Sequence, residues 1–425
     1  MKGNPRWTKG PSRCDVCYDM ADVFCTRRTM MCCLCFLIIL GCLTISFINI
    51  IQPPWDAKDE LGLSFTKKFP DAKVQRDFDL TQQKLIERDL EWQHALVNNP
   101  IIDTVLIGHH GLAKKYIFIL EGGYVAMAKP VERNQFFYPH AAFPTLQWDY
   151  ENPISAVRMD RDYQGWGELC GTALDRVLGW YRKPTVMGRY LDSKLLYYHD
   201  YSLLGRIQYA LPSRNIPVAM HAWVTGLATR APNDNMAAFL RNEGEDERII
   251  YSLALEYSDI LVFDFLLDDH DRLGSHNWKS SADRKMLVWD SGLAWNFGPK
   301  NADTEILCGT HLWNGDDQFD TPHDIKRPTC TRICKFRKDT ILKLQYHGPT
   351  ADPENKLGRL LEKELEKDVL DYSFEYGIFK VKPSGFFWWF YQSARFEKQD
   401  FFDGLDDKVQ VLLDHVDECI LKYGE

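Results

Sequence analysis

The longest stretch of the chain without a charged residue runs between Arg28 and Asp56. Its central part, Met30–Ile51, reads MMCCLCFLIILGCLTISFINII and is long and apolar enough to cross a bilayer as one helix. A cleaved signal peptide is the alternative, but its apolar part would be shorter and followed by small residues, whereas Gln52 and two prolines follow here. The sequence therefore predicts an uncleaved transmembrane helix over residues 29–51.

The charges that flank this span predict its orientation. Six lysines and arginines precede it, whereas the first basic residue after it, Lys58, stands among three acidic residues. Because Lys and Arg accumulate on the cytosolic side of a membrane, the N-terminus is expected to stay in the cytosol. Residues 1–28 then form a cytosolic tail and residues 52–78 a stem, and the remainder is lumenal or extracellular.

The charge balance excludes one class of partner. The chain has 425 residues and a net charge of −9. Non-specific binding to nucleic acid needs a basic face, so a nucleic-acid partner is not expected.

The cysteines are consistent with an oxidising compartment. Seven of the twelve lie in the predicted tail and span, and five lie beyond them. Up to two disulfides can form among the distal five, which leaves one thiol over, and the sequence does not define the pairing. The distal cysteines are Cys170, Cys308, Cys330, Cys334 and Cys419.

The part after the stem begins rich in β-type runs and continues with helical patterns. Short runs over residues 103–108, 116–120 and 124–129 predict an antiparallel meander, and further strand-like runs occur over 185–191, 218–227 and 286–289. Helical spacing is found over 81–97, 165–180, 246–265, 335–345, 356–372 and 405–423. This order predicts an α+β fold of two lobes, a β-rich N-lobe over residues 79–190 and a helical C-lobe over residues 191–425, with a ligand cleft between them.

Four charged residues follow one another in an order that suits phosphoryl transfer. Lys129 ends a strand-like run, and Glu168 lies on the helix that follows it. Asp271 follows a long apolar helix, and Asp290 follows a short strand and precedes Ser-Gly. Taken singly, each has a structural explanation as a surface charge, a helix cap or a turn residue. As a set they provide the charge neutralisation and positioning on which phosphoryl transfer depends.

Four stretches of the chain also carry a family likeness. They are Ala128–Pro130, Gly167–Arg189 (GELCGTALDRVLGWYRKPTVMGR), Phe263–Arg272 (FDFLLDDHDR) and Val288–Gly298 (VWDSGLAWNFG). From about residue 101 onward, the chain resembles the atypical kinases of the secretory pathway, the group of the four-jointed kinases, the Golgi casein kinase and the glycosaminoglycan xylosylkinase. The second stretch is similar to that family's glutamate helix with Asp-Arg-x-Leu-Gly and its Pro-Pro-x-x-x-Gly-Arg strand. The third and fourth resemble its catalytic Asp-Arg and metal-binding Asp-Asn-Gly segments.

The resemblance implies a role for each matching residue. Lys129 would contact the nucleotide phosphates, and Glu168 would pair with Lys129. Asp271 would be the catalytic base and Asp290 a metal ligand, with ATP and Mn²⁺ or Mg²⁺ as cofactors. The fold implied is the two-lobed atypical protein-kinase-like fold, behind the single transmembrane helix.

The resemblance also bears on the cysteines. Cys330, Cys334 and Cys419 fall where relatives carry disulfide cysteines, although Cys330 and Cys334 are not adjacent as in the casein kinase branch. With Cys308 they form the set of disulfide candidates.

The chain departs from the family pattern at two places. Kinases of this group have Asn or Glu five positions after the catalytic Asp, where this chain has His276, with Asn277 next. A one-residue insertion would let Asn277 serve as the second metal ligand. Asp290 is followed by Ser291 rather than by the commoner Asn or Glu. These departures motivate an alternative, a pseudokinase that binds or activates an active relative.

A type II Golgi glycosyltransferase is a further alternative. Such enzymes often hold a metal and a sugar nucleotide with a short Asp-x-Asp motif, which Asp160-Arg-Asp162 and Asp269-His-Asp271 both fit. Neither motif follows a doubly wound α/β pattern, so the kinase reading is preferred.

Topology and resemblance together predict a lumenal or extracellular phosphotransferase. It would transfer the γ-phosphate of ATP to a hydroxyl of secretory-pathway substrates, on protein Ser/Thr or on a glycan of a proteoglycan. The expected location is the Golgi membrane, as a single-pass type II protein that cleavage of the stem would release for secretion. A homodimer, or a heterodimer with a related kinase, is compatible with this prediction.

Overall fold

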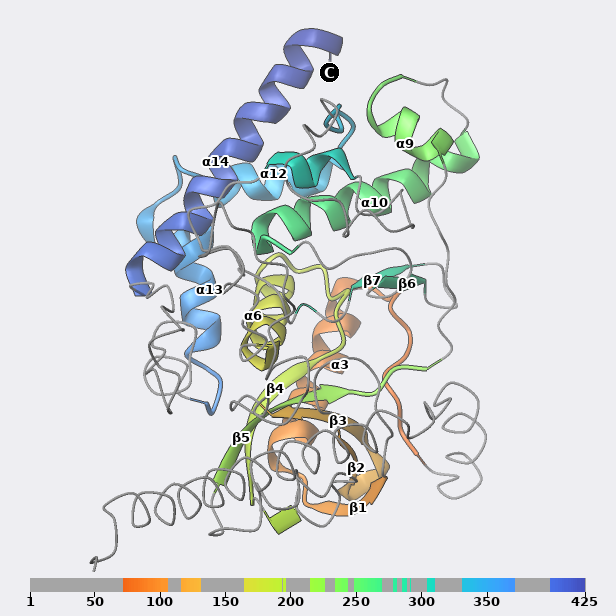
Figure 1. Ribbon diagram of the computed structural model, residues 1–425, viewed down its shortest axis with the longest axis vertical. Helices are drawn as coiled ribbons and strands as arrows, with labels where there is room; N and C mark the ends of the chain where they lie inside the picture. The colour runs from red at the N-terminus through yellow and green to blue at the C-terminus, as the bar shows by residue number, and fades with distance from the viewer. Residues whose placement is uncertain are drawn as a thin grey trace, which may run out of the picture. The chain divides into compact units, whose positions relative to one another are not determined.

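The computed structural model describes residues 72–105, 116–130, 164–192, 194–195, 215–225, 234–243, 248–269, 278–280, 285–288, 291, 304–309, 331–370 and 398–424 (Figure 1). All of them belong to the second of two compact units, which begins at Pro54. The predicted span over residues 29–51 lies outside these ranges. Among the helices within them, none combines the length and the apolar character of a membrane span.

A five-stranded antiparallel sheet forms the β-rich part, in the spatial order β1-β2-β3-β5-β4. Its strands are β1 (Ile101–Val105), β2 (Tyr116–Leu120), β3 (Val125–Pro130), β4 (Val186–Asp192) and β5 (Asn215–Ala222). The first three form the meander predicted from the sequence. A separate two-stranded ribbon consists of β6 (Trp278–Ser280) and β7 (Met286–Val288).

The sheet includes backbone pairing with residues from outside the range predicted for the N-lobe, at both of its ends. Strand β5 lies between β3 and β4, so a strand from beyond residue 190 is an interior member of the sheet. At the other end, Lys73 and Gln75 of the predicted stem form bridges with Tyr124 and Val224. The predicted limits of residues 79 and 190 therefore differ from the observed pairing, because backbone hydrogen bonds and not sequence distance decide which segments belong to the sheet.

The helices form most of the remaining described structure. They are α3 (Gln82–Asn98), α6 (Gln164–Val177), α9 (Asp234–Leu240), α10 (Arg248–Leu267), α12 (Lys338–Tyr346), α13 (Leu357–Leu365) and α14 (Lys398–Tyr423). Short 3₁₀ turns are η1 (Glu121–Gly123), η4 (Thr304–Cys308) and η6 (Pro353–Asn355). Each helix expected beyond the predicted stem is present, with ends that shift by several residues in α13 and α14.

The two faces of the sheet pack against different helices. Ala128 of β3 and Met220 of β5 share a core with Trp92 of α3. Because side chains alternate along a strand, Lys129 and His221 stand on the opposite face. Helix α6 contacts β3, β4 and β5 and shares a second core with Ala219, the partner of Lys129 in the register. Lys129 therefore faces α6.

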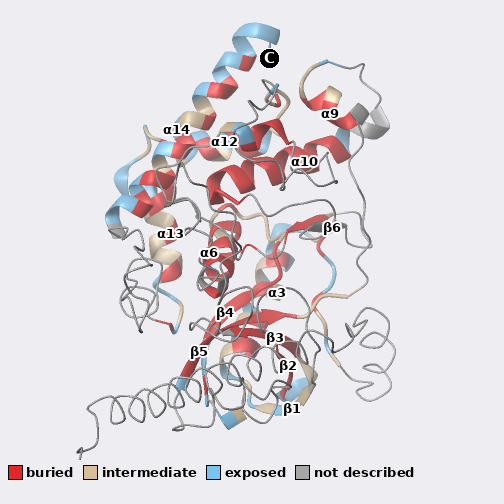
Figure 2. Ribbon diagram, in the orientation of Figure 1, coloured by how far each residue is buried: buried red, intermediate tan, exposed pale blue. Residues whose placement is uncertain are grey.

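Helix α10 is the centre of the helical part. Its residues from Leu253 onward are buried on every side, which fits a sequence that is apolar almost all round (Figure 2). It contacts α9, α14, η4 and β7. The helix ends at Leu267, as expected for the predicted apolar run. Of the acidic turn predicted after it, the structure describes the residues up to the buried Asp269.

Three of the four candidate cysteines lie within the described residues, and all three are disulfide-bonded. Cys334, which precedes α12, is bonded to Cys419 of α14. Cys308 is also disulfide-bonded. Within the described ranges Cys170 is the free cysteine, and it is buried in α6. Cys330 lies outside the described residues.

Candidate active site

Lys129 of β3 and Glu168 of α6 form a buried ion pair. The Lys129 Nζ donates to Oε1 of Glu168 at 2.5 Å, and the two residues are 2% and 1% exposed. The face of β3 that carries Lys129 points toward α6, while Leu169 and Ala173 of α6 pack into the apolar core. The structure thus brings together the strand lysine and the helix glutamate that the sequence singled out.

A second lysine, which the sequence reasoning missed, contacts the same glutamate. Lys183 Nζ lies 3.4 Å from Oε2 of Glu168 and donates to Oγ of Ser291 at 2.8 Å. The backbone N–H of Ser291 donates to the same Oε2 at 3.2 Å. A signal was present in the sequence, because Lys183 stands where the family pattern has the first of its two prolines.

The electrostatics around Glu168 favour its ionised form. Burial on its own would raise the pKa of Glu168, but the positive charges of Lys129, Lys183 and His221 outweigh burial and hold the pKa of that carboxyl well below its usual value. His221 comes from β5, on the sheet face that carries Lys129. It too was missed, since nothing in the sequence shows that β5 enters the sheet beside β3.

One face of α6 carries the site. Glu168, Gly171, Thr172 and Asp175 recur at the three- and four-residue spacing that places side chains on one side of a helix, and the three with side chains are buried. Gly171 faces Ser291 and Lys183: a Cβ built on it would lie 3.1 Å from Ser291 Cβ and 3.3 Å from Lys183 Cε. A glycine here therefore permits the close approach of both residues to α6.

Asp175 fixes the backbone that presents Lys183. Its carboxylate accepts the N–H of Arg182 at 3.1 Å and the N–H of Lys183 at 2.9 Å. Burial raises the pKa of Asp175 to about 6, although these hydrogen bonds and the charges of Lys183 and Arg182 act in the opposite direction. The Asp of the Asp-Arg-x-Leu-Gly motif thus positions a site residue from outside the site.

Other residues of the same family-like stretch are structural. Arg176 pairs with Asp89 of α3 at 2.8 Å. Arg189 donates to the carbonyl oxygen of Asn99 at 2.8 Å, at the end of α3. The N–H of Gly188 donates to Asp368, which follows α13, at 2.8 Å. These contacts hold β4 and α6 against α3 and α13, so these residues of the stretch build the scaffold around Glu168 and Lys183.

The other predicted site residues lie outside the described residues. These are Asp271, Asn277 and Asp290, together with His276 and the Asp160-Arg-Asp162 motif. Their roles stay predictions. Ser291, the residue after Asp290, is described and fully buried, and its contacts with Glu168 and Lys183 connect the segment that contains Asp290 to the Lys129–Glu168 pair.

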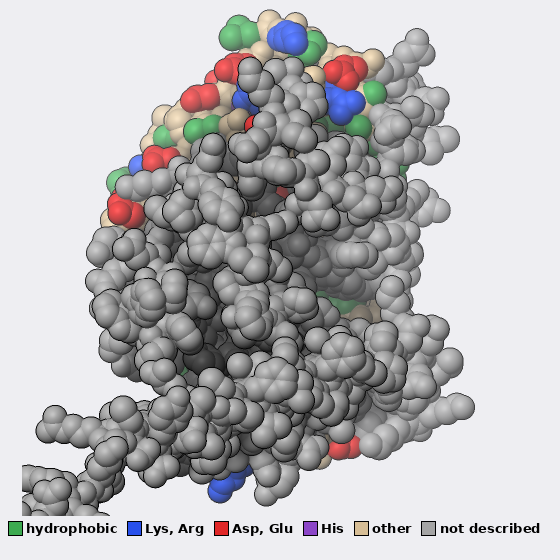
Figure 3. Space-filling view, in the orientation of Figure 1, with side chains coloured by type: hydrophobic (Ala, Val, Ile, Leu, Met, Phe, Trp, Pro, Cys, Tyr) green, Lys and Arg blue, Asp and Glu red, His purple; other side chains and the backbone are tan. Residues whose placement is uncertain are grey.

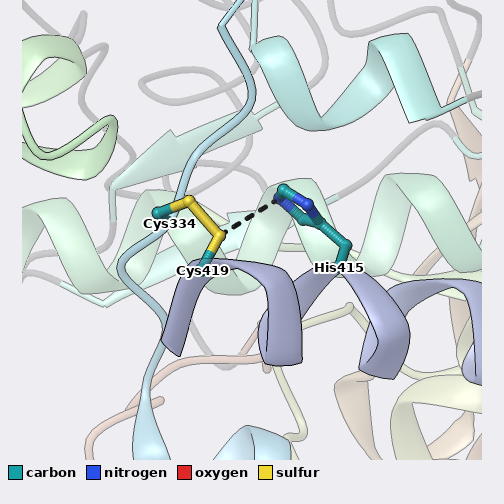
Figure 4. Close-up of side chains that lie close together, drawn as sticks. All are labelled: Cys334, His415 and Cys419. Carbon is teal, nitrogen blue, oxygen red and sulfur yellow. Dashed lines mark hydrogen bonds between the residues drawn. A yellow bond between two sulfur atoms is a disulfide. The ribbon is translucent and has the colours of Figure 1, made fainter. Parts of the chain in front are cut away.

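Cys334, His415 and Cys419 come together elsewhere as a group of potential metal ligands (Figure 4). The two sulfurs are bonded to each other, and His415 Nε2 lies 3.7 Å from Cys419 Sγ and 2.8 Å from the carbonyl oxygen of Ile333. Zinc sites of this type need thiolate ligands, which a disulfide does not offer. The group is therefore a covalent cross-link with a neighbouring histidine.

On the face shown in Figure 3, acidic and basic side chains stand close together over α14 and do not segregate by sign.

Comparison with protein-family models gave no match. No curated protein sequence matches the chain either.

Solved structures do match it. The crystal structure of the Golgi casein kinase matches with a TM-score of 0.50 at 14% identity, covering 90% of this chain and 91% of its own. The structure of hydra Fam20 with sugar matches with a TM-score of 0.50 at 17% identity, covering 84% of this chain and 95% of its own. A structure of the Golgi casein kinase with Mn/ADP bound gives a TM-score of 0.49 at 14% identity, covering 90% and 91%. From the first two matches, the chain has the kinase-like fold of these proteins, as the sequence resemblance implied.

Proposed function

We propose that the chain is a secretory-pathway kinase that transfers the γ-phosphate of ATP to a hydroxyl of secretory proteins, on Ser or Thr, or of a proteoglycan glycan. The observation that carries the proposal is the buried Lys129–Glu168 pair between β3 and α6, within a fold shared with the Golgi casein kinase. Kinases use such a strand lysine and helix glutamate to hold the phosphates of ATP.

The burial of this pair supports function over a purely structural role. Removing two charges from water costs free energy that their attraction often fails to recover, and an apolar pair of similar size is frequently as stable. Lys129 and Glu168 are nevertheless almost completely buried, and Glu168 is held ionised by the cations around it. Strongly perturbed, buried charges of this kind concentrate at functional sites.

The remaining roles follow the resemblance. Lys129, oriented by Glu168, binds the nucleotide phosphates. Asp271 accepts the proton of the acceptor hydroxyl, and Asp290 and Asn277 hold Mn²⁺ or Mg²⁺. A carboxylate and an amide oxygen are hard ligands that suit these cations. The cation, when bound, supplies charge neutralisation between the phosphates.

The location is part of the proposal. The predicted span over residues 29–51 and the basic tail before it support a single-pass type II protein of the Golgi membrane with a lumenal catalytic unit. The Cys334–Cys419 disulfide supports an oxidising compartment. Release by cleavage of the predicted stem over residues 52–78, and a dimer with a second copy or a related kinase, are compatible with this topology.

A pseudokinase is the second candidate, and Ser291 favours it. The position after Asp290 carries a hydroxyl that is engaged by Lys183, where related kinases carry Asn or Glu. A pseudokinase would bind the nucleotide and a related kinase without transferring phosphate. The glycosyltransferase alternative loses support, because the described sheet is antiparallel and shows no doubly wound arrangement.

The test uses the full-length chain purified in detergent and incubated with labelled ATP and either Mn²⁺ or Mg²⁺. Acceptors are a panel of secretory proteins and a xylose-containing linker, with Asp290→Ala and Lys129→Met as inactive controls. Label that appears on an acceptor with the wild type and not with the controls supports the kinase. Nucleotide binding without transfer to any acceptor supports the pseudokinase, and binding of a UDP-sugar without ATP binding would contradict both.

A further inference from the structure

Two buried residues from distant parts of the chain contact each other. Lys183 and Ser291 are 108 positions apart, and the Lys183 Nζ donates to Ser291 Oγ at 2.8 Å in a buried environment.

The residues around this contact hold Lys183 in place and leave room for both side chains. The backbone N–H of Lys183 is held by Asp175, so the start of its side chain is fixed relative to α6. Gly171 leaves the space through which Lys183 and Ser291 reach Glu168, since a Cβ there would crowd both of them. Lys183 itself is 3% exposed, which separates it from an ordinary solvated lysine.

Glu168 connects Lys129, Lys183 and Ser291. Its Oε1 accepts from Lys129, and its Oε2 accepts from Lys183 and from the backbone N–H of Ser291. One carboxylate thus joins strand β3, the loop before β4 and the segment after β7.

We propose that Lys183 is a positioning residue that holds Ser291 against Glu168. Ser291 directly follows the proposed metal ligand Asp290 in the chain, so Lys183 would restrain the position of that ligand relative to the Lys129–Glu168 pair. The inference rests on the proposed function for the reaction that it affects. It assigns to this chain a second lysine that acts through Ser291 and Glu168 and does not itself touch the acceptor.

The consequence is a specific kinetic signature. Loss of the Lys183 ammonium leaves Lys129 paired with Glu168, so ATP binding is largely retained, while Ser291 loses its hydrogen bond with Lys183. Misplacement of a reacting group by about 1 Å costs on the order of a hundredfold in rate. We expect Lys183→Met to lower kcat by about tenfold to a hundredfold and to change the KM for ATP by less than about threefold.

The test compares the full-length wild type with Lys183→Met, Ser291→Ala and the double variant across a Mn²⁺ series. Met keeps the length of the side chain and the backbone N–H that Asp175 accepts, so only the ammonium is removed. If Lys183 acts through Ser291, the double variant loses no more kcat than the stronger single variant, because both remove the same contact. Both single variants should also need more Mn²⁺ for half-maximal activity.

Lys343→Met is the matched control. It removes a half-buried lysine of α12 whose Nζ lies beside Gly179, after the end of α6. This variant should keep the wild-type kcat and Mn²⁺ dependence. A melting temperature measured for each variant separates loss of the site from loss of the fold.

A second readout does not need turnover. Binding of Mn²⁺ with the non-hydrolysable analogue AMP-PNP is measured by calorimetry, and Lys183→Met should weaken the dependence of analogue binding on Mn²⁺. If the wild type is active and both readouts are unchanged in Lys183→Met, the inference is wrong and the proposed function stands. If the wild type neither transfers phosphate nor binds the analogue, the proposed function fails and the inference fails with it. Additive losses in the double variant also contradict the inference.

Discussion

Gly171 and Ser291 are packed so closely that a Cβ added to Gly171 would lie 3.1 Å from the Cβ and 3.2 Å from the Oγ of Ser291. Gly171 lies inside α6, where glycine is normally unfavourable. Replacing an interior helical glycine with alanine contributes about 1 kcal/mol of helix propensity. In this helix the added methyl group has to displace Ser291 by a few tenths of an ångström.

Gly171→Ala therefore has opposed effects on folding and on the site. We expect the melting temperature to stay within about 4 °C of the wild type, a shift that corresponds to roughly 1 kcal/mol in a large domain. Phosphate transfer should fall by about tenfold, because the segment that contains Asp290 is moved away from Glu168. Thermal melts and steady-state rates on the same preparation test this, and full activity would show that the close approach has no catalytic role.

The charge arrangement around Glu168 predicts unequal effects of removing its partners. Glu168→Gln leaves the ammonium groups of Lys129 and Lys183 buried without their shared anion, and breaking a buried pair in this way costs about 3–5 kcal/mol. Lys129→Met leaves Glu168 with Lys183, at 3.4 Å, and should cost clearly less. Urea unfolding of both variants measures the difference. Equal losses would mean that Lys183 does not support Glu168.

The local features of the site were predictable from sequence, and the long-range ones were not. Lys129 and Glu168 were identified because a strand-end lysine and a helix glutamate are each visible within a few residues. The position of β5 between β3 and β4 depends on pairing between distant segments. The same pairing brings His221 of β5 close to Glu168. The contact of Lys183 with Ser291 was not predictable, because the two residues are 108 positions apart and meet only in the folded chain.

Element types were also more predictable than element limits. Helix α10 was evident from its continuous apolar character, which burial on all sides explains. Helix α13 ends at Leu365 and not near residue 372, because Asp368 turns back to accept the N–H of Gly188. That interaction joins two elements 180 positions apart, and helical periodicity carries no information about it.

The raised pKa of Asp175 predicts a pH dependence of stability. The pKa of this buried carboxyl is about 6 in the folded chain, against an ordinary value of 3.8. The folded state therefore binds more protons than the unfolded state between these values, and stability falls as pH rises through that window. At about 1.4 kcal/mol for each pH unit, the contribution lost by pH 7 is roughly 3 kcal/mol.

Asp175→Asn removes this titration, so the stability difference between the wild type and the variant should change with pH. The wild type should gain stability relative to Asp175→Asn on going from pH 7 to pH 4.5, as measured by urea unfolding at both values. The comparison at each pH cancels the other titrating groups. A difference that does not vary with pH would contradict the assignment of a raised pKa to Asp175.

The Cys334–Cys419 disulfide predicts a loss of stability on reduction. The bond joins residues 85 positions apart, linking the segment before α12 to α14. Closing a loop of that length restricts the unfolded chain, and its loss costs about 4.6 kcal/mol in the chain-entropy description. The Cys334→Ser, Cys419→Ser double variant should show this loss in urea unfolding under oxidising conditions.

The oxidised wild type should gain no stability from added Zn²⁺, because both sulfurs are already bonded. Stabilisation of the oxidised protein by Zn²⁺, and its absence in the double variant, would instead identify the cysteines and His415 as a metal site.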